Sequence, residues 1–371
     1  MLAKEPTRVK RGDGVRRLTR VFPAAVLVAL AVAATASGAG GGWTAQTTPN
    51  PQGGGNLEGG VSCWSETGCI AVGDGGKSGR MLAERWNGTS WTIQKTPGAA
   101  WDSPDGISCW SASGCVAVGG VFNFFAARWN GRAWSLQKPV HPHLGARLEA
   151  VSCWSARGCA AVGFATDSAG NSSTLAERWN GTSWTVQKSP NPKGGGSLYA
   201  ASCSSARACI AVGVTNNGRT LAERWDGQTW KLQRTPTTYG GGILYGVSCW
   251  SKADCIAVGS NRDTGGRTIV ERWNGTSWTL QKTPSPPDGL LSAVSCWSAT
   301  GCIAVGPPAS ARGAATGEVW NGSAWTLQNP LSSTFIAQGV SCWLARRCVA
   351  VGAEFHGGSY FSTSAELWSG Q

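Results

Sequence analysis

The motif VSCWSxxGCIAVG recurs seven times along this chain of 371 residues, and this repetition constrains the fold more than any other feature. Successive copies lie 44 to 50 residues apart, measured between their first cysteines. These first cysteines are Cys63, Cys109, Cys153, Cys203, Cys249, Cys296 and Cys342. A period of this length is typical of architectures in which one small supersecondary unit packs only against its two neighbours.

Each repeat contains four short apolar stretches of the form VSCWS, CIAVG, TLAERW and SWTLQK, separated by glycine or by Asn-Gly. The junction WNGTSW places Asn-Gly between two strand-like stretches, which is a strong hairpin signal. A unit of four antiparallel strands has two faces and cannot bury both alone, whereas seven units stacked radially can. We therefore predict an all-β chain that forms a seven-bladed β-propeller of four-stranded antiparallel blades.

The two ends of the chain share one repeat between them. The seventh repeat stops at SAELWSGQ, after its third strand, and the missing fourth stretch, GGWTAQTTP, stands alone from Gly41 onwards. We predict that residues 43–49 form a closing strand, so that the N-terminal strand completes the last blade and closes the ring. The propeller then comprises residues 43–371, with blades from about residue 56 to residue 371.

Residues 1–36 have the features of an export signal. Seven basic and two acidic side chains precede an apolar stretch from Val21 to Ala36, which ends in the small-residue site Ala34-Thr35-Ala36. We predict a signal peptide at 1–36, a short glycine-rich linker at 37–42, and a secreted, extracellular protein with no membrane contact after cleavage. The same stretch is compatible with an uncleaved anchor, and the export route stays open.

All 14 cysteines occur in seven C-x5-C pairs, one in each repeat. Each pair straddles the tight turn between the first two strands, where facing side chains come close enough to be bridged. We predict seven structural disulfides, which suit an exported protein. They join Cys63 to Cys69, Cys109 to Cys115, Cys153 to Cys159, Cys203 to Cys209, Cys249 to Cys255, Cys296 to Cys302 and Cys342 to Cys348. Because zinc needs four ligands and no histidine lies near these pairs, we predict neither a metal site nor a cofactor.

The charge pattern gives no indication of a nucleic-acid partner. The formal net charge is +12, and removing the seven basic and two acidic residues of the signal leaves 12 − 5 = +7, spread thinly over the repeats. Nucleic-acid binding needs a concentrated basic stripe, so we expect none.

A glutamate stands before the Arg-Trp pair, or its variant, in six of the repeats, and Ala127 takes its place in the second. These glutamates are Glu84, Glu177, Glu223, Glu271, Glu318 and Glu366. Repetition once per blade favours a structural role over a catalytic one. We expect each glutamate to pair with a basic side chain of an adjoining strand, such as Lys95 or Lys188, where two blades pack together.

The repeats differ from one another mainly on one face of the ring. The connections between second and third strands, and those between blades, emerge on this face, which we call the top face. Loops on a rigid scaffold commonly carry binding residues, and aromatic rings there suit sugars, peptides or another protein. The candidate ligand-binding residues are Trp101, His141, His143, Tyr199, Tyr239, Tyr245, His356 and Tyr360. We predict a monomeric binding or scaffold protein whose ligand is a glycan or a protein at the cell surface.

The sequence argues less for an enzyme, and we assign no catalytic residue. Acids outside the repeat pattern are scattered along the chain with no recognisable spacing; they are Asp102, Asp105, Asp167, Asp263, Asp288 and Glu354. No G-x-S-x-G or H-E-x-x-H motif is present. One alternative is a carbohydrate-active hydrolase or lyase, which would require two or more carboxylates converging at the mouth of the central channel. The other is a purely structural surface protein.

The units VSCWSxxGCIAVG and TLAERWNGTSWTLQKTP resemble repeats of secreted proteins from actinobacteria, and in outline those of kelch-like and sialidase-like propellers. The resemblance covers nearly all of the chain from Trp43 to Gln371. It implies a propeller fold and export.

Overall fold

The computed structural model describes residues 42–98, 102–120, 124–140, 145–236, 240–261, 266–284, 289–308, 315–328, 332, 334–357 and 361–370. The described residues belong to one compact unit, which begins at Gly40. The predicted signal peptide lies outside the described residues. Within the described part, no helix is both long enough and apolar enough to cross a membrane.

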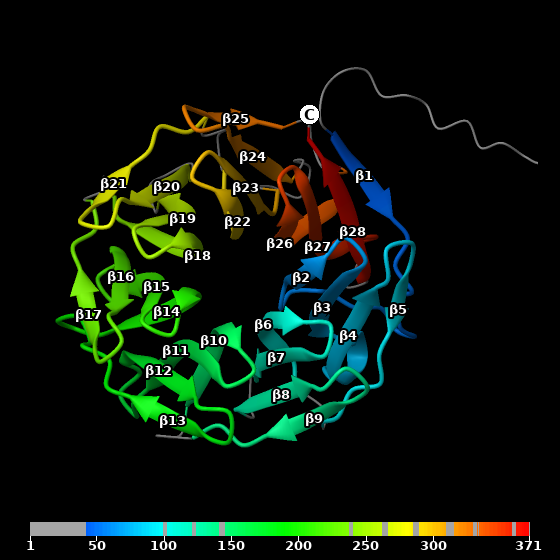
Figure 1. Ribbon diagram of the computed structural model, residues 1–371, viewed down its shortest axis with the longest axis horizontal. Coiled ribbons are helices and arrows are strands. Elements are labelled where there is room, and N and C mark those ends of the chain that lie inside the picture. The colour runs from blue at the N-terminus through cyan, green and yellow to red at the C-terminus, as the bar shows by residue number, and fades with distance from the viewer. Residues whose placement is uncertain are drawn as a thin grey trace, which may run out of the picture. The chain divides into compact units, whose positions relative to one another are not determined.

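The strands form seven separate four-stranded antiparallel sheets, which are the blades of a propeller (Figure 1). Blade one contains β2 (Val61–Ser65), β3 (Gly68–Asp74), β4 (Met81–Trp86) and β5 (Trp91–Ile93), with a 3₁₀ turn at Gly76–Ser78. Blade two contains β6 (Pro104–Ser111), β7 (Gly114–Gly119), β8 (Phe125–Trp129) and β9 (Trp134–Gln137). Blade three contains β10 (Ala146–Ser155), β11 (Gly158–Thr166), β12 (Ser172–Trp179) and β13 (Trp184–Gln187).

The remaining blades repeat this order. Blade four contains β14 (Gly196–Ser205), β15 (Ala208–Thr215), β16 (Thr220–Trp225) and β17 (Trp230–Gln233). Blade five contains β18 (Gly242–Ser251), β19 (Asp254–Asn261), β20 (Thr268–Trp273) and β21 (Trp278–Leu280). Blade six contains β22 (Ala293–Ser298), β23 (Gly301–Gly306), β24 (Thr316–Trp320) and β25 (Trp325–Leu327). Blade seven contains β26 (Phe335–Leu344), β27 (Arg347–Phe355), β28 (Phe361–Ser369) and β1 (Gly42–Gln46).

The N-terminal strand closes the ring, as the sequence predicts. Strand β1 pairs antiparallel with β28, the blue and red strands that lie side by side in Figure 1, and Trp43 is opposite Trp368. The strand is shorter than the predicted 43–49. Pro49 cannot donate a backbone hydrogen bond, and side chains replace the ladder there. The Thr48 hydroxyl donates to the Thr363 carbonyl at 2.6 Å, and Asn50 Oδ1 accepts from the Thr363 N–H at 2.6 Å.

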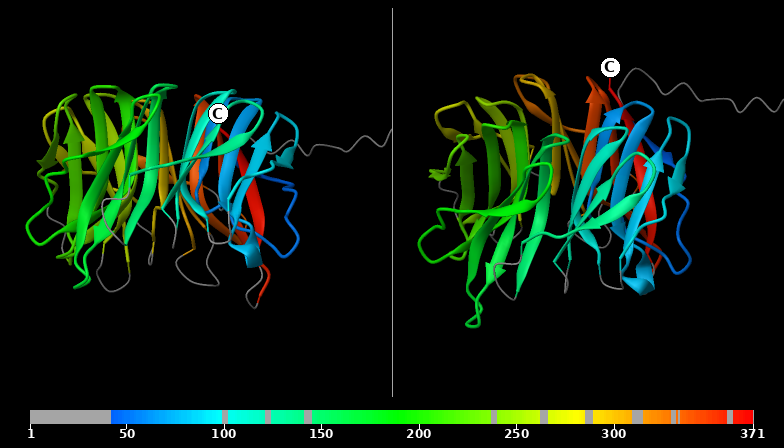
Figure 2. Two further views of the ribbon diagram at one scale, coloured as in Figure 1. Left: turned by 90° about the horizontal axis from the view of Figure 1, so that it is seen from below. Right: turned by 60° about the horizontal axis from the view of Figure 1, so that its bottom comes forward.

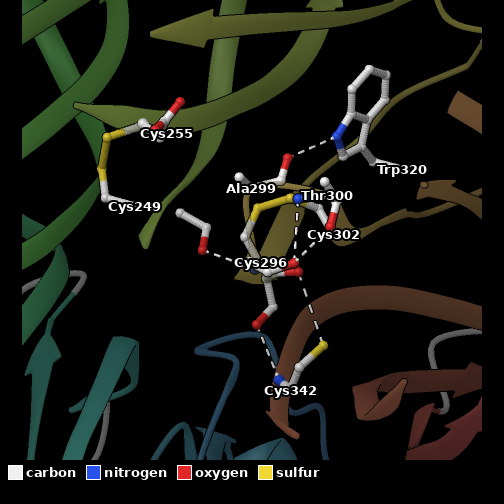
Figure 3. The surroundings of a disulfide bond; sticks show 12 residues. Cys249, Cys255, Cys296, Ala299, Thr300, Cys302, Trp320 and Cys342 are labelled. Carbon is white, nitrogen blue, oxygen red and sulfur yellow. Dashed lines mark hydrogen bonds between the residues drawn. A yellow bond between two sulfur atoms is a disulfide. The ribbon is translucent and has the colours of Figure 1, made fainter. Parts of the chain in front are cut away.

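All seven predicted disulfides are present, one at the end of each blade. The two cysteines of each pair are direct register partners across the first hairpin, as Cys296 and Cys302 are in blade six. A tryptophan of the third strand anchors the same turn: Trp320 Nε1 donates to the Ala299 carbonyl at 3.2 Å (Figure 3). In blades one, two, four and six the hairpin is therefore fixed both covalently and by an indole hydrogen bond, whereas Trp179, Trp273 and Trp368 do not form this bond.

A circle of equivalent hydrogen bonds joins the innermost strands of all seven blades. The serine that precedes each first cysteine accepts from the cysteine N–H of the next blade, as Ser295 accepts from Cys342 at 3.0 Å in Figure 3. The last of these bonds runs from Cys63 N–H to Ser341 Oγ at 3.0 Å and joins blade one to blade seven. The other acceptors are Ser62, Ser108, Ser152, Ser202 and Ser248.

The apolar core lies between blades, not within one blade. Val116 and Val118 of β7 pack with Leu148 and Val151 of β10 in the next blade, and equivalent clusters occur around the ring. Because both faces of each sheet are covered by neighbours, the second strands are almost wholly buried. Figure 2 shows the blades side-on, with their strands running between the two faces of the ring.

The repeated glutamates lie in these inter-blade layers, but our prediction that they pair with lysine or arginine is wrong. All six are buried, and no ion pair among the described residues includes one of them. Their partners come from the preceding blade and are uncharged. Ser189 Oγ donates to Glu223 at 2.8 Å, and Thr268 Oγ1 donates to Glu318 Oε1 at 3.1 Å.

The hydrogen-bond partner of each glutamate varies with the residue at one position of the preceding blade. This position lies three residues before that blade's own glutamate, and it is a threonine beside four of the six glutamates. Where it is Phe124, the backbone N–H of Val140 donates to Glu177 at 3.2 Å instead. Where it is Met81, the facing residue is Ala127, and both join one apolar cluster. The break in the glutamate series therefore matches a break in its partner.

A chain that lacks β1 tests the ring closure. Starting the protein at Gln52 removes the Trp43–Trp368 contact and the side chains that bond Thr363, so the free energy of unfolding should fall by about 3 kcal/mol or more. A peptide of residues 42–51 added in trans should restore the melting temperature measured by calorimetry. A scrambled peptide of the same composition is the control. Equal melting temperatures for the full and shortened chains would contradict closure by β1.

The buried glutamates predict that the ring becomes less stable as pH rises. Burial raises the pKa of Glu84, Glu177, Glu223 and Glu318 to about 7 and that of Glu271 to about 8. The folded state therefore binds more protons than the unfolded chain between the ordinary carboxyl pKa of 4.5 and these values. The stabilisation is fully present below the ordinary pKa and is lost as pH rises through 7 to 8.

Denaturant unfolding between about pH 5 and about pH 8.5 measures this effect, which should be on the order of 1 to 3 kcal/mol for each glutamate. Glu271→Gln keeps the side-chain shape without the charge and should reduce the loss of stability at high pH by the share of this one glutamate, while the other four still titrate. Glu66→Gln, at an exposed turn, should leave the profile as it is. Stability that is flat or rises across this range would show that the glutamates do not titrate as described.

Candidate functional site at the axial cavity

The innermost strands of five blades carry a β-bulge near the top face. The register shifts lie between Pro104 and Gly106, Leu148 and Ala150, Leu198 and Ala200, Leu244 and Gly246, and Ala337 and Gly339. The extra residues are Asp105, Glu149, Tyr199, Tyr245 and Gln338. A bulge re-aims the side chain that it carries. All five residues line the cavity on the axis of the ring.

The glycine that ends each CIAVG motif makes room for the bulge. Gly163 pairs with Leu148, directly beside the bulge, and a Cβ on it would lie 1.9 Å from the Arg147 carbonyl oxygen. A Cβ on Gly259 would lie 1.8 Å from the Ile243 carbonyl oxygen in blade five. No other residue permits this approach. The repeated glycine therefore permits the bulge that orients the side chains of the cavity.

The cavity has a volume of about 600 Å³ and is bounded by the first strands of all seven blades. Small residues line part of its wall in four successive blades, namely Gly106, Ala150, Ala200 and Gly246. The larger side chains belong to the preceding residue in each strand, such as Glu149 before Ala150 and Tyr245 before Gly246. This volume lies within the usual range for sites that hold a small ligand or a single side chain.

One arginine and three carboxylates form the polar side of the cavity, contributed by blades one, two and three. Arg147 binds Asp105 through two bonds, Nη2 to Oδ1 at 2.6 Å and Nε to Oδ2 at 3.0 Å. Arg147 Nε also lies 3.0 Å from Glu149 Oε1. Glu58 accepts a hydrogen bond from Ser103 Oγ at 3.1 Å and lies within the electrostatic range of both Asp105 and Arg147.

Positive charge is scarce in this cluster. Burial raises the pKa of Glu149 to about 7; the nearby Asp105 adds to the shift, and Arg147 opposes it. Burial also raises the pKa of Asp105 and of Glu58, and Arg147 lowers each only in part. A single guanidinium therefore balances three carboxyl groups that the protein partly withdraws from water.

Two tyrosines form the adjacent part of the wall, in blades four and five. Tyr199 and Tyr245 stack with their ring centroids 5.9 Å apart and their planes at 21°. Both are half-buried. Burial raises the pKa of Tyr199, and Glu149 raises it further, so this phenol stays protonated beside the carboxylates. Ser292 and Gln338 complete the circle in blades six and seven.

Of the three predicted site residues that the structure describes, Tyr199 and Tyr245 line this cavity. His356 lies on the β27–β28 hairpin, where its Nε2 is 2.6 Å from Ser362 Oγ, and it does not line the cavity. It stands beside an exposed aromatic pair, Phe355 and Phe361, whose ring centroids are 5.4 Å apart. The other candidates, Trp101, His141, His143, Tyr239 and Tyr360, lie outside the described residues.

Sequence reasoning missed the acidic part of the site, although the repeat contains a signal for it. Asp105, Glu149, Tyr199, Tyr245, Ser292 and Gln338 each lie four positions before the first cysteine of their repeat. We described Asp105 as one of several scattered acids, but the fold places it against Arg147 and near Glu58 and Glu149. Among the described residues, no group of three histidine, cysteine or carboxylate side chains is arranged to hold a metal ion.

No family model matches the chain, and no curated protein matches it either. Solved structures do. YCF48 bound to a D1 peptide superposes with a TM-score of 0.59 at 14% identity, covering 89% of this chain and 95% of that one. The WD40 β-propeller domain of Doa1 gives 0.58 at 10%, covering 89% and 98%. An Aleuria aurantia lectin in complex with Fucα1-6GlcNAc gives 0.52 at 12%, covering 74% and 96%. At these identities the likeness shows the fold alone.

The charge balance of the cavity can be measured through Glu149. Side-chain carbon NMR should give a pKa of about 7 for this residue, well above the ordinary carboxyl value. In Arg147→Gln the pKa should rise further, because the opposing cation is gone while burial and Asp105 remain. An unchanged or lower Glu149 pKa in the variant would mean that Arg147 does not hold this carboxylate.

Proposed function

We propose that this chain is an exported binding propeller whose ligand, a glycan or a protein segment, enters the axial cavity from the top face. The observation that carries the proposal is the convergence of unlike side chains on one cavity of about 600 Å³. Successive blades contribute Glu58, Asp105, Glu149, Tyr199 and Tyr245, and the last four stand at equivalent bulge positions. Side chains needed only for packing would repeat from blade to blade, as the buried positions of the motif do.

The fold comparisons support a binding role without naming the ligand. Two of the similar propellers have been solved with a bound ligand: YCF48 with a D1 peptide, and the lectin with a fucose-containing disaccharide. The exported, extracellular location is supported by the seven disulfides and by the signal-like residues 1–36. We propose a monomer, with Trp101, His141, His143, Tyr239, His356 and Tyr360 as secondary contacts from the loops around the cavity.

A carbohydrate-active enzyme is the second candidate, because carboxylates do converge at the channel mouth. Glu149, with a pKa of about 7, has the character of a general acid near neutral pH. Glu58 and Asp105 offer second carboxylates. Turnover of any glycan that binds should then be lost in Glu149→Gln while binding remains. A bound glycan that stays intact over long incubation would exclude this role for that ligand.

The binding proposal is tested by a combined glycan and peptide screen on the oxidised protein of residues 37–371. Tyr245→Ala should weaken any selective ligand by about tenfold or more, because a stacked aromatic wall is lost at the centre of the site. Phe355→Ala removes an exposed aromatic ring that does not line the cavity and should leave affinity unchanged. Trp101→Ala tests the loop contribution.

Calorimetry of each variant confirms that the ring is still folded. Full affinity in both Tyr199→Ala and Tyr245→Ala would place the ligand elsewhere and overturn the proposal.

A further inference from the structure

The axial cavity carries negative charge in a protein that is basic as a whole. Lysine and arginine outnumber aspartate and glutamate by 32 to 20, and the net charge of residues 37–371 is still +7. The cavity wall reverses this balance, with Glu58, Asp105 and Glu149 against Arg147 alone. A concave wall of one sign focuses the electrostatic field and raises the local concentration of ions of opposite charge. The cavity is therefore negatively charged in a protein whose net charge is positive, and its charge favours cations over anions.

The guanidinium of Arg147 is already engaged. Two of its nitrogens bind Asp105, and one of these also approaches Glu149, at 2.6 to 3.0 Å. Glu58 forms no ion pair with any described residue: it accepts hydrogen bonds from Ser103 Oγ at 3.1 Å and from Asn56 Nδ2 at 3.2 Å, and Arg147 acts on it only at longer range. A second cation placed between Glu58 and Glu149 would provide the charge that the cluster lacks. A neutral ligand would cover the same carboxylates without compensating them.

The tyrosine pair limits the shape of that cation. Tyr199 and Tyr245 stand in the two blades after Glu149, so a ligand that reaches the carboxylates passes along aromatic rings. Such rings favour aliphatic stems and attract cations through their faces. The next residues in the wall, such as Gly106 and Gly246, carry no side chain and leave space on the axis. An aliphatic stem with a charged tip matches both parts of the wall, the tyrosine rings and the carboxylates.

We propose that the cavity binds an ammonium or guanidinium group on an aliphatic stem, as found in a lysine or arginine side chain of a protein segment and in free polyamines. This inference rests on the proposed function, because it assigns a ligand class to the same cavity. The charged tip lies among Glu58, Asp105 and Glu149, and the stem lies against Tyr199 and Tyr245. The site thereby selects extended basic segments or polyamines over neutral glycans.

Binding depends on pH through the groups that face Glu149, which are Asp105 and Arg147 on one side and Tyr199 on the other. Protonation of Glu149 at acid pH removes one of the charges that hold the cation. Arg147 and Tyr199 keep their protonation state across the neutral range, because the pKa of each is raised from an ordinary value that already lies far above it. Affinity should therefore fall on acidification from about pH 8 to about pH 5, and should also fall with added salt.

Calorimetric titration with five probes tests the inference. The pentapeptide Gly-Gly-Arg-Gly-Gly and its lysine analogue carry the cation on a peptide, and spermidine carries it on a free amine. Two matched peptides replace arginine by citrulline, which has the same shape without charge, or by norleucine. Arginine or lysine should bind about tenfold or more tightly than citrulline and norleucine. Tight peptides with weak spermidine assign the natural source to a protein; the reverse order assigns it to a polyamine.

Three variants locate the binding. Glu58→Gln should weaken the arginine peptide several-fold without breaking an ion pair of Arg147, and Tyr245→Ala should weaken it comparably. Glu66→Gln removes one equal charge from an exposed turn, outside the cavity, and should leave affinity unchanged. A loss of affinity in Glu66→Gln equal to that in Glu58→Gln would mean that only general charge is sensed, and would overturn the inference.

Two further outcomes also decide it. Equal affinity for the arginine and citrulline peptides, or no binding of any cationic probe at millimolar concentration, overturns the cation class. These results stay distinct from failure of the proposed function. If a neutral ligand from the screen still requires Tyr199 and Tyr245, the cavity is the binding site and only its assignment to cations is wrong.

Discussion

Every feature of this molecule depends on the contact between neighbouring blades. Each sheet has two apolar faces, and its second strand is buried on both, so no blade is stable without a neighbour on each side. The serine-to-cysteine hydrogen bonds repeat this contact seven times near the axis, and the bond from Cys63 to Ser341 completes the circle. Strand β1 then joins the chain ends within blade seven. Each contact between neighbouring blades is made both by apolar packing and by hydrogen bonds, and this combination holds the ring together.

The scaffold repeats closely in its buried strands but differs from blade to blade at the positions that line the axial cavity. The glycine of the CIAVG motif lets the first strand bulge, and in five blades the bulge turns one side chain toward the axis. Gly163 makes room for the bulge at Glu149, and Gly259 makes room for the bulge at Tyr245. The backbone arrangement is the same in both blades, but one side chain is an acid and the other is aromatic. The repeat thus fixes where the side chain points, while the residue itself sets what the cavity attracts. Charged side chains in some blades and aromatic side chains in the next can therefore line neighbouring parts of the same cavity.

The period, the hairpin signals and the displaced half-repeat were enough to predict the fold, the disulfides and the closure, because these depend on local pattern and on counting strands. The partners of the glutamates could not be found in this way. Glu223 meets Ser189 across a blade boundary, and no pattern within one repeat shows which side chain faces it. Charge complementarity favoured a lysine, but a buried layer accommodates a hydroxyl at lower desolvation cost.

The site was predicted in part, for a related reason. Tyr199 and Tyr245 were found because aromatic residues stand out from the motif, whereas Asp105 and Glu149 resemble ordinary surface acids in the sequence. Aligning the repeats at the fourth position before the first cysteine would have placed all of them on one ring. Glu58 escapes even this alignment, because Gly59 and Gly60 add one residue before Val61.

A crystal structure of the oxidised protein with its tightest ligand would locate that ligand without reference to any variant. We expect ligand density on the axis of the ring, with a cationic group beside Glu58 and Glu149 and a stem along Tyr199. Density confined to the outer strands, or to the face that carries the disulfides, would contradict this expectation.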